Sequence, residues 1–196
     1  MHDERVLGAM SQVAREEFVP PDFRVSAYEN EPLPIGAGQT ISQPLIVAIM
    51  TEALGLQGSE KVLEVGTGSG YQAAILSLLA ESVISVERLP DLASAAQERL
   101  ERLGYKNVRV KGADASVLGW PAEAPYQAII VTAGVPRLPD SLVAQLAEGG
   151  RLVVPIGSGL SQDLTRVTSL ANGGLRFESL GPCRFVPLIG PEAWPE

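Results

Sequence analysis

The chain has 196 residues, of which 45% are hydrophobic and 19% are charged, and its formal net charge is -8. This composition is typical of a folded globular domain and excludes a disordered or collagen-like chain. The acidic balance disfavours a nucleic-acid backbone as the main partner, because Lys and Arg make most of the contacts with phosphates. We therefore expect a single globular domain that binds no nucleic acid.

Cysteine and histidine are almost absent, since Cys183 and His2 are the only residues of their kinds. A disulfide within the chain is impossible, and a zinc site or a catalytic triad that needs histidine is disfavoured. The N-terminus lacks the apolar stretch of a signal peptide, and no apolar run approaches the roughly 20 residues that span a bilayer. We expect a cytoplasmic monomer with no metal site and no membrane contact.

The first part of the chain, residues 1–57, is predicted to hold two helices and a substrate-side loop. Apolar residues recur at helical spacing over residues 3–17. Residues 20–38 are rich in Pro and Gly and are predicted to be mostly loop. A second helix is expected over residues 44–54, with Pro44 in its first turn.

Residues 58–160 alternate between short runs rich in Val, Ile and Leu and longer helical patterns. This alternation predicts a cofactor-binding core with an α/β fold, a Rossmann-like, doubly wound and mostly parallel sheet. The predicted strands cover residues 61–65, 83–86, 108–110, 128–132 and 151–156, and the predicted helices cover residues 72–80, 91–103 and 140–147.

The last part of the chain, residues 161–196, has a different pattern. Two β-prone segments, residues 164–170 and 175–180, are separated by the turn-forming pair Asn172-Gly173. This spacing is typical of a β-hairpin. We predict an antiparallel hairpin at the edge of the sheet, followed by a segment on the substrate side.

A glycine-rich segment from Glu64 to Tyr71 lies between the first strand of the core and its helix. That position is the carboxyl end of the sheet, where open α/β folds bind ligands. Glycines allow a tight turn there and let a ligand approach the backbone. The spacing is G-x-G-x-G, and Tyr71 stands where the dinucleotide pattern has its third glycine, which disfavours NAD.

Two acidic residues accompany this turn. Glu64 lies two residues before the first glycine, Gly66, where methyltransferases that use S-adenosylmethionine have an acidic residue close to the methionine portion of the cofactor. Glu87 ends the second strand, where a carboxylate can accept both ribose hydroxyls, as it also does in NAD enzymes. The pair favours an S-adenosylmethionine site. Two alternatives stay open: the glycines only turn a strand into a helix, or Glu64 only caps backbone amides.

Three segments resemble one family, the protein-L-isoaspartate O-methyltransferases. Residues 32–44 are similar to the family's substrate-side signature, residues 62–74 to its cofactor loop, and residues 184–188 to its C-terminal segment. Residues 131–136 and 149–155 follow in the expected order, so the resemblance covers about residues 4 to 190. It implies a methyltransferase that acts on isoaspartyl-containing peptides and proteins and converts S-adenosyl-L-methionine to S-adenosyl-L-homocysteine.

The resemblance also implies roles for individual positions. Ser42 corresponds to the active-site serine, near the reacting carboxylate. The implied cofactor-binding residues, together with Glu64, are Gly66, Thr67, Gly68, Gly70, Glu87, Asp114, Ala115 and Thr132. The implied substrate-binding residues are Thr40, Ile41, Ser42, Val186, Pro187 and Leu188.

Some positions depart from the family's pattern. Ala113 and Ala115 stand where glycines usually flank the acidic residue Asp114, Asn30 replaces an aspartate, and Ala37 replaces a bulky aromatic residue. Three alternatives to the isoaspartyl methyltransferase stay open, and the departures at Ala37 and around Asp114 favour only the second of them. They are a methyltransferase of the same fold acting on RNA or a small molecule, a binding module that has lost transfer, and an NAD-dependent oxidoreductase.

The expected chemistry suits a chain so poor in histidine. A free α-carboxylate has a reference pKa of roughly 3.3 to 3.7, so it is ionised at neutral pH and needs no general base. Catalysis would then come from alignment and from fixed hydrogen-bond donors. Ser42 is expected to donate a hydrogen bond and not to act as a nucleophile. Because Ser42 also precedes a predicted helix, the alternative is that it caps that helix.

Overall fold

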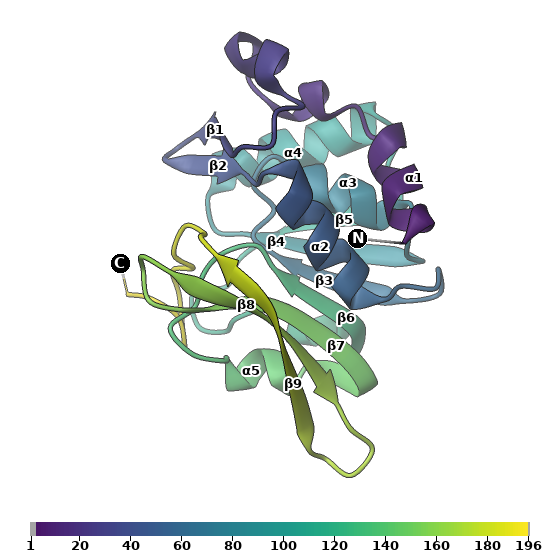
Figure 1. The fold of residues 1–196 in the computed structure, drawn as a ribbon, viewed down its shortest axis with the longest axis vertical. Coiled ribbons are helices and arrows are strands. Elements are labelled where there is room, and N and C mark those ends of the chain that lie inside the picture. The colour runs from purple at the N-terminus through teal and green to yellow at the C-terminus, as the bar shows by residue number, and fades with distance from the viewer. Residues whose placement is uncertain (1–2, 196) are drawn as a thin grey trace.

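A seven-stranded sheet forms the centre of the molecule, and helices cover both of its faces (Figure 1). The computed structural model describes residues 3–195, so His2 lies outside the described residues. The helices are α1 Glu4–Gln12, α2 Pro44–Leu54, α3 Tyr71–Ser77, α4 Pro90–Arg102 and α5 Asp140–Val143, with 3-10 turns η1 Arg15–Phe18, η2 Pro21–Ser26 and η3 Pro121–Glu123. The strands are β1 Leu33–Gly36, β2 Gln39–Ile41, β3 Lys61–Val65, β4 Ser82–Glu87, β5 Val108–Gly112, β6 Tyr126–Val131, β7 Leu146–Gly157, β8 Gln162–Ser169 and β9 Leu175–Cys183.

The strand order in the large sheet is β5-β4-β3-β6-β7-β8-β9. The strands from β5 to β7 are parallel to their neighbours, whereas β8 and β9 are added antiparallel. Strands β1 and β2 form a separate small hairpin. The predicted fold class and the antiparallel hairpin at the edge are confirmed, and β3, the first strand of the alternation, is an interior strand between β4 and β6.

The central strands are buried on both faces, as is usual for parallel strands between helices. Alternate side chains of β3 enter different cores: Val62 packs with helices α1 to α4, and Leu63 packs on the opposite face, where α5 lies. Both side chains have no exposed surface. The position of the strand ends, where a ligand would bind, is therefore fixed from two sides.

Three predicted helices are shorter than expected. Helix α3 ends at Ser77 and not at residue 80. Helix α1 ends at Gln12 and not at residue 17, because the extended backbone of Val13 turns the chain so that both Val13 and Phe18 reach the core. Helix α5 ends at Val143, and the segment from Leu146 onward pairs with β6 as part of β7. Pairing with a neighbouring strand outweighed the local helical pattern there.

The predicted loop over residues 20–38 contains regular structure. Turn η2 and strand β1 lie within it, so the prediction of mostly loop was wrong for these parts. The tip of the hairpin is Gly36, Ala37 and Gly38, all with positive φ. Ala37 has a φ of 50°, a conformation that is uncommon for residues with a side chain.

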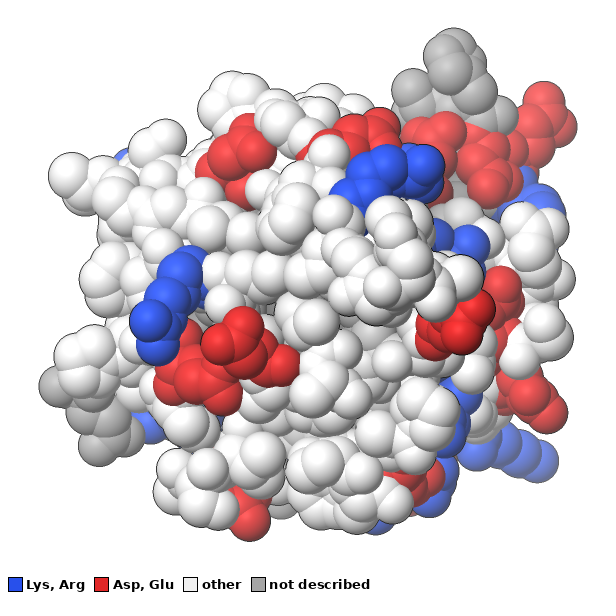
Figure 2. All heavy atoms as spheres, turned by 90° about the horizontal axis from the view of Figure 1, so that it is seen from below, with Lys and Arg blue, Asp and Glu red and all other residues white. Residues whose placement is uncertain are grey.

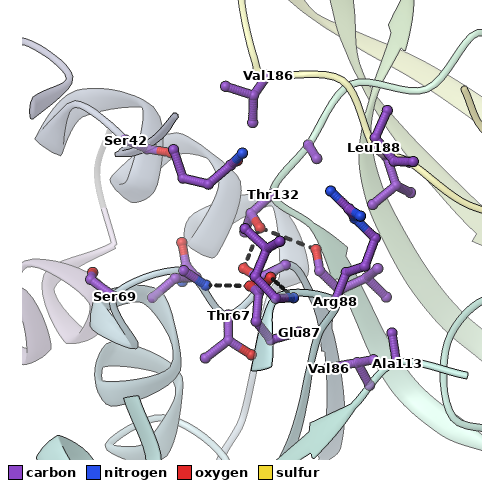
Figure 3. Close-up of a pocket in the computed structure, with 18 of the residues that line it drawn as sticks. Ser42, Thr67, Ser69, Val86, Glu87, Arg88, Ala113, Thr132, Val186 and Leu188 are labelled. Carbon is purple, nitrogen blue, oxygen red and sulfur yellow. Dashed lines mark hydrogen bonds between the residues drawn. The ribbon is translucent and has the colours of Figure 1, made fainter. Parts of the chain in front are cut away.

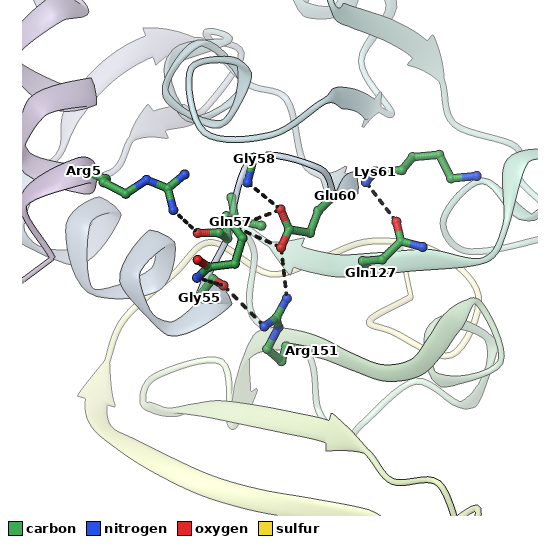
Figure 4. A network of polar contacts seen from close by, with 9 residues as sticks. Arg5, Gly55, Gln57, Gly58, Glu60, Lys61, Gln127 and Arg151 are labelled. Carbon is green, nitrogen blue, oxygen red and sulfur yellow. Dashed lines mark hydrogen bonds and ion pairs between the residues drawn. The ribbon is translucent and has the colours of Figure 1, made fainter.

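A closed polar network stabilises the amino end of β3 (Figure 4). The Glu60 carboxylate accepts hydrogen bonds from the Gln57 and Gly58 amides, each at 2.9 Å, and lies 3.7 Å from Arg151 Nη2. Arg151 also donates to the Gly55 carbonyl. Burial alone would raise the pKa of Glu60, but the amide hydrogen bonds outweigh it and lower that pKa. The Glu60 carboxylate is therefore well satisfied at this end of the sheet, whereas Arg151 Nε has no hydrogen-bond partner among the described residues.

Charges of both signs are mixed on the surface. Arg166 of β8 pairs with Glu178 of β9, and Arg102 of α4 pairs with Glu17. Figure 2 shows acidic and basic side chains near one another on the face seen from below. Across residues 3–195, no helix combines the length and the apolar character needed to cross a membrane.

Candidate active site

A pocket lies at the carboxyl ends of β3, β4 and β6 (Figure 3). Its walls come from the turn after β3, the end of β4, the segment after β5 and the first residues after β6. Residues 39–42 and 186–189 complete it. Parallel strands end at one edge of the sheet, so segments far apart in the sequence meet there.

The turn after β3 is held by Thr132, the residue that follows β6. The Thr132 hydroxyl donates to the Gly66 carbonyl at 2.5 Å, and its amide donates to the Val65 carbonyl at 3.0 Å. Gly66 has a φ of 102°, and a Cβ atom placed on it would lie 2.3 Å from Thr132 Oγ1. Only glycine fits at this position, because both the backbone conformation and the nearby hydroxyl exclude a side chain.

Glu87 at the end of β4 braces the same turn. Its two carboxylate oxygens accept hydrogen bonds from the amides of Gly68, at 2.8 Å, and Leu89, at 3.0 Å. The side chain lines the pocket although the residue is only 8% exposed. Each carboxylate oxygen can accept more than one hydrogen bond, so Glu87 keeps acceptor capacity toward the pocket.

Glu64 lies behind the pocket wall and does not line the pocket. It is 0% exposed, and its Oε2 accepts a hydrogen bond from Ser85 Oγ at 2.5 Å. Ser85 Oγ in turn lies 2.5 Å from the hydroxyl of Thr67, a residue of the glycine turn. Burial raises the pKa of Glu64 to about 8, the Ser85 hydrogen bond opposes that rise, and Glu87 adds to it. The other oxygen, Oε1, has no partner among the described residues.

Three of the other expected cofactor positions also lie outside the pocket lining. Asp114 and Ala115 are exposed, and the Asp114 carboxylate accepts hydrogen bonds from the hydroxyl and the amide of Ser116, which lower its pKa. Gly70 faces helix α4, since a Cβ atom there would lie 3.3 Å from a methyl group of Leu100. An adenine contact through Asp114 stays a prediction.

Several lining residues were not predicted from the sequence. After β5 the wall is made by Ala113 and residues 117–119, and after β4 it includes Arg88 and Leu89. The only sequence signal for them is that they follow predicted strands. Which of these residues faces the pocket depends on the path of each loop, and the pattern of apolar residues does not specify that path.

Ser42 stands between β2 and α2 and lines the pocket. Its hydroxyl makes no hydrogen bond with the described part of the chain. The N-cap of α2 is Gln43, and the side chain that accepts a hydrogen bond at this helix end, from the Leu45 amide at 3.0 Å, belongs to Asn30. The alternative in which Ser42 caps the helix is therefore wrong, and its hydroxyl is available.

The C-terminal segment that resembles the substrate side is fixed beside Ser42. The Gly134 amide donates to the Val186 carbonyl, and the Leu188 amide donates to the Gly134 carbonyl, both at 2.8 Å. Gln162 accepts a hydrogen bond from the Phe185 amide at 2.8 Å. Figure 3 shows Val186 and Ser42 on one side of Thr132, with Glu87 and Ala113 on the other.

A second cavity adjoins the first on this side. The two cavities share five lining residues, which are Thr40, Ser42, Thr132, Val186 and Pro187. All five were among the positions that the resemblance implied. Ile41 and Leu188 line the first cavity only.

The residues of the first cavity fit S-adenosylmethionine. The Glu87 carboxylate offers acceptors for ribose hydroxyls, and Gly66 and Gly68 bring backbone close to the cavity without side chains. Apolar side chains, Val86 and Leu118 among them, provide a wall for a flat ring. Residues 3–195 contain no group of three or more His, Cys, Asp or Glu side chains arranged to hold a metal ion.

Comparison with known proteins gives one family. A family model described as Protein-L-isoaspartate(D-aspartate) O-methyltransferase (PCMT) matches residues 1–193. Protein-L-isoaspartate O-methyltransferase 1 of Syntrophobacter fumaroxidans is 56% identical over 194 residues, which are 99% of this chain and 90% of that protein. Protein-L-isoaspartate O-methyltransferase 2 of Pelobacter propionicus is 56% identical over 195 residues, covering 99% and 86%.

Solved structures agree. A protein-L-isoaspartate O-methyltransferase has a TM-score of 0.86 and 32% identity over 97% of this chain, which spans 62% of the length of that chain. A Plasmodium falciparum protein assigned to the beta-aspartate methyltransferases (PCMT), in complex with S-adenosyl-L-homocysteine, has a TM-score of 0.80 and 27% identity, covering 95% and 90%.

These likenesses and the pocket at the strand ends define the class as S-adenosylmethionine-dependent methyltransferases. Within that class, the chain belongs to the protein-L-isoaspartate(D-aspartate) O-methyltransferase family. The resemblance, the fold class and the cofactor expected from the sequence are confirmed.

Proposed function

We propose that this chain transfers a methyl group from S-adenosylmethionine to the free α-carboxylate of isoaspartyl residues in proteins. The observation that carries the proposal is the pair of adjoining cavities, which share Ser42, Thr132 and Val186. One cavity has the donor and acceptor set for the cofactor, and the other opens beside a serine hydroxyl that has no partner among residues 3–195. Names of relatives at 56% identity support the same substrate class.

The cofactor supplies an electrophilic methyl group on a sulfonium, and the residues of the chain supply position. Glu87 and the glycine turn hold one side of the cavity, because Gly68 and Glu87 are hydrogen-bonded to each other. Thr132 ties that turn to β6 next to Val186. Alignment of two reactants in this way is worth effective molarities of about 10⁵ to 10⁸ M.

Ser42 has the role of a donor toward the substrate carboxylate. The carboxylate arrives ionised, so no side chain has to remove a proton from it. Glu64 is not a base for this reaction, because it is buried behind the cavity wall. The free Ser42 hydroxyl would orient the carboxylate and replace part of its hydration as the methyl group transfers.

The residue assignments within this proposal rest on placement in the cavities. For the cofactor these are Gly66, Thr67, Gly68, Glu87 and Thr132; for the substrate they are Thr40, Ile41, Ser42, Val186, Pro187 and Leu188. The division into residues 1–57, 58–160 and 161–196 of one domain, the monomeric state, the lack of a nucleic-acid partner and the cytoplasmic location stay predictions.

A direct test uses methyl-labelled S-adenosylmethionine and two peptides that differ only in an isoaspartyl or an aspartyl residue. The expected result is a base-labile methyl ester on the isoaspartyl peptide alone. Binding of the cofactor without transfer would favour a binding module, and transfer to RNA or to a small molecule but not to either peptide would favour another acceptor. Both outcomes would overturn the proposal.

The Ser42→Ala variant tests the mechanism. We expect the rate of methyl transfer to fall at least about tenfold, because the variant loses a hydrogen-bond donor to a charged group. Affinity for S-adenosyl-L-homocysteine should change little. Ser11→Ala is the matched control, since Ser11 is exposed on α1 and donates only to the Gly8 carbonyl. Equal rates in Ser42→Ala and the unaltered protein would remove Ser42 from the mechanism.

A further inference from the structure

Arg15, in turn η1, is a fully buried cation. The residue is 0% exposed, and it makes no ion pair with a carboxylate within residues 3–195. Its Nε donates to the Ala27 carbonyl at 2.6 Å, and its Nη2 donates to the Ser42 carbonyl at 2.8 Å. The guanidinium carbon lies 4.8 Å from the centre of the Tyr71 ring.

Burial of a charge without a counter-ion is costly, so this arrangement has to be compensated by fixed partners. The neighbouring acidic residues are engaged elsewhere: Glu16 accepts a hydrogen bond from Tyr28, and Glu17 pairs with Arg102. The compensation comes from two carbonyls and one aromatic face, a combination that the planar fork of arginine suits and the compact lysine ammonium does not. Nη1 remains without a partner.

The contact with Ser42 is the informative one. Ser42 lies between the end of β2 at Ile41 and the start of α2 at Pro44, outside both elements. The hydrogen bond from Arg15 is the single hydrogen bond that the described residues make with Ser42, through either its backbone or its side chain. Among the described residues, this guanidinium is therefore the one hydrogen-bond donor that holds the backbone of Ser42.

The contact with Tyr71 reaches the cofactor side. Tyr71 is the first residue of α3, directly after the glycine turn, and it lines the first cavity. Its ring also packs edge-on against Phe18 of η1, with 5.5 Å between ring centres. One buried side chain thus contacts both the segment that presents Ser42 and the helix that follows the cofactor turn.

We propose that Arg15 is a positioning residue for methyl transfer. Its guanidinium donates a hydrogen bond to the Ser42 carbonyl and packs on the Tyr71 ring, and so fixes the position of Ser42 relative to the cofactor turn. The inference rests on the proposed function. It predicts that the transferring step, and not cofactor binding, depends on the guanidinium, because a displacement of about 1 Å in an aligned pair of reactants can lower the rate by about 100-fold.

The test compares Arg15→Lys and Arg15→Met with the unaltered protein. We expect kcat for an isoaspartyl peptide to fall about tenfold in Arg15→Lys and about 100-fold in Arg15→Met, with Kd for S-adenosyl-L-homocysteine within about threefold. Arg102→Lys and Arg102→Met are matched controls, because Arg102 is exposed and pairs with Glu17, and kcat should not change. Activities are compared per folded protein, after thermal unfolding curves.

The outcomes separate the two levels of the proposal. If the unaltered protein does not methylate the isoaspartyl peptide, the proposed function and this inference both fail. If it does, and the Arg15 variants are less stable but keep kcat, Arg15 has only a structural role and the inference alone is overturned. A fall in cofactor affinity as large as the fall in kcat would overturn it as well.

A measurement on the unaltered protein covers the case in which the variants do not fold. With ¹⁵N-labelled arginine, the Arg15 Nε–H resonance is expected to shift when the isoaspartyl peptide is added to the complex with S-adenosyl-L-homocysteine. The aspartyl peptide should leave it in place. An Arg15 resonance that responds to neither peptide would overturn the inference.

Discussion

Two glutamates, one at each end of β3, have opposite surroundings. Glu60, just before the strand, is nearly buried, but amides of Gln57 and Gly58 and the guanidinium of Arg151 surround its carboxylate. Glu64, near the other end, is fully buried with one hydroxyl donor and one oxygen without a partner. One strand therefore has a satisfied anchor at its amino end and a poorly solvated carboxyl group next to the ligand pocket.

The pKa values of the two carboxyl groups shift in opposite directions, as their surroundings do. Burial opposes ionisation of Glu60, but the amide hydrogen bonds together outweigh it and lower the pKa of this group. The contribution of Glu60 to stability is therefore present at pH values above its ordinary pKa and is lost as pH falls. Burial raises the pKa of Glu64 to about 8, so its contribution is present at low pH and lost as pH rises toward 8. The comparison shows that the amino end of β3 stabilises the fold, whereas the carboxyl end carries the site at some cost in stability.

The largest expected effect is on cofactor affinity, and it distinguishes the two ends of β3 by one glycine near each end. Gly66→Ala should lower affinity for S-adenosyl-L-homocysteine at least about 100-fold, or ~2.7 kcal/mol, because its Cβ atom would displace the Thr132 hydroxyl that holds the turn. Gly58→Ala is the control, with a φ of 107° and no atom closer than 3.9 Å to the added Cβ. It should cost stability and leave affinity within about twofold, as measured by calorimetry. Equal losses of affinity in the two variants would contradict the view that only the carboxyl end of β3 serves cofactor binding.

The next effect is on stability at the amino end. Glu60→Gln should lower the free energy of unfolding at pH 7 by about 2 kcal/mol, since an amide cannot replace an anion that accepts from two backbone amides and lies beside Arg151. Activity per folded molecule should not change. Glu178→Gln, which breaks the exposed pair with Arg166, should cost less than about 1 kcal/mol. Urea unfolding measures both, and a similar loss in the two variants would contradict the role of Glu60.

Taken per pH unit, the smallest expected effect is the pH dependence of stability that Glu64 introduces. Between its ordinary pKa of 4.5 and about 8, the unfolded chain releases the Glu64 proton and the folded chain keeps it. The free energy of unfolding should therefore fall with rising pH by up to ~1.4 kcal/mol per pH unit in that window. Glu64→Gln should remove this slope in urea unfolding from pH 5 to 9. An unchanged slope in the variant would show that Glu64 does not hold a proton in the folded state.

Local patterns predicted most of the fold. Strand β3 and helix α2 have the predicted bounds, and the hairpin of β8 and β9 forms around Asn172 and Gly173 as expected. The end of α1 and the start of β7 were wrong. In both places a long-range requirement overrode local propensity, namely burial of Val13 and pairing of Leu146 with β6.

The candidate site was predictable only in part. The pocket holds most of the positions implied by the family motifs, among them Ser42, Glu87 and Val186. Glu64 and Asp114 were also expected to hold the cofactor, but one is buried behind the wall and the other is exposed beyond it. A motif gives the order of residues along the chain, and the direction of each side chain follows from the strand and loop that carry it.

The sequence by itself determined the alternation of strands and helices, the glycine turn and the family, because these depend on residue type, spacing and local backbone preference. Only the tertiary structure decided that Ser42 is free of the helix cap, that Glu64 is sealed from the pocket, and that Arg15 spans from Ala27 to Ser42. Such contacts join residues far apart in the chain, and their energies depend on burial, which no stretch of sequence specifies alone.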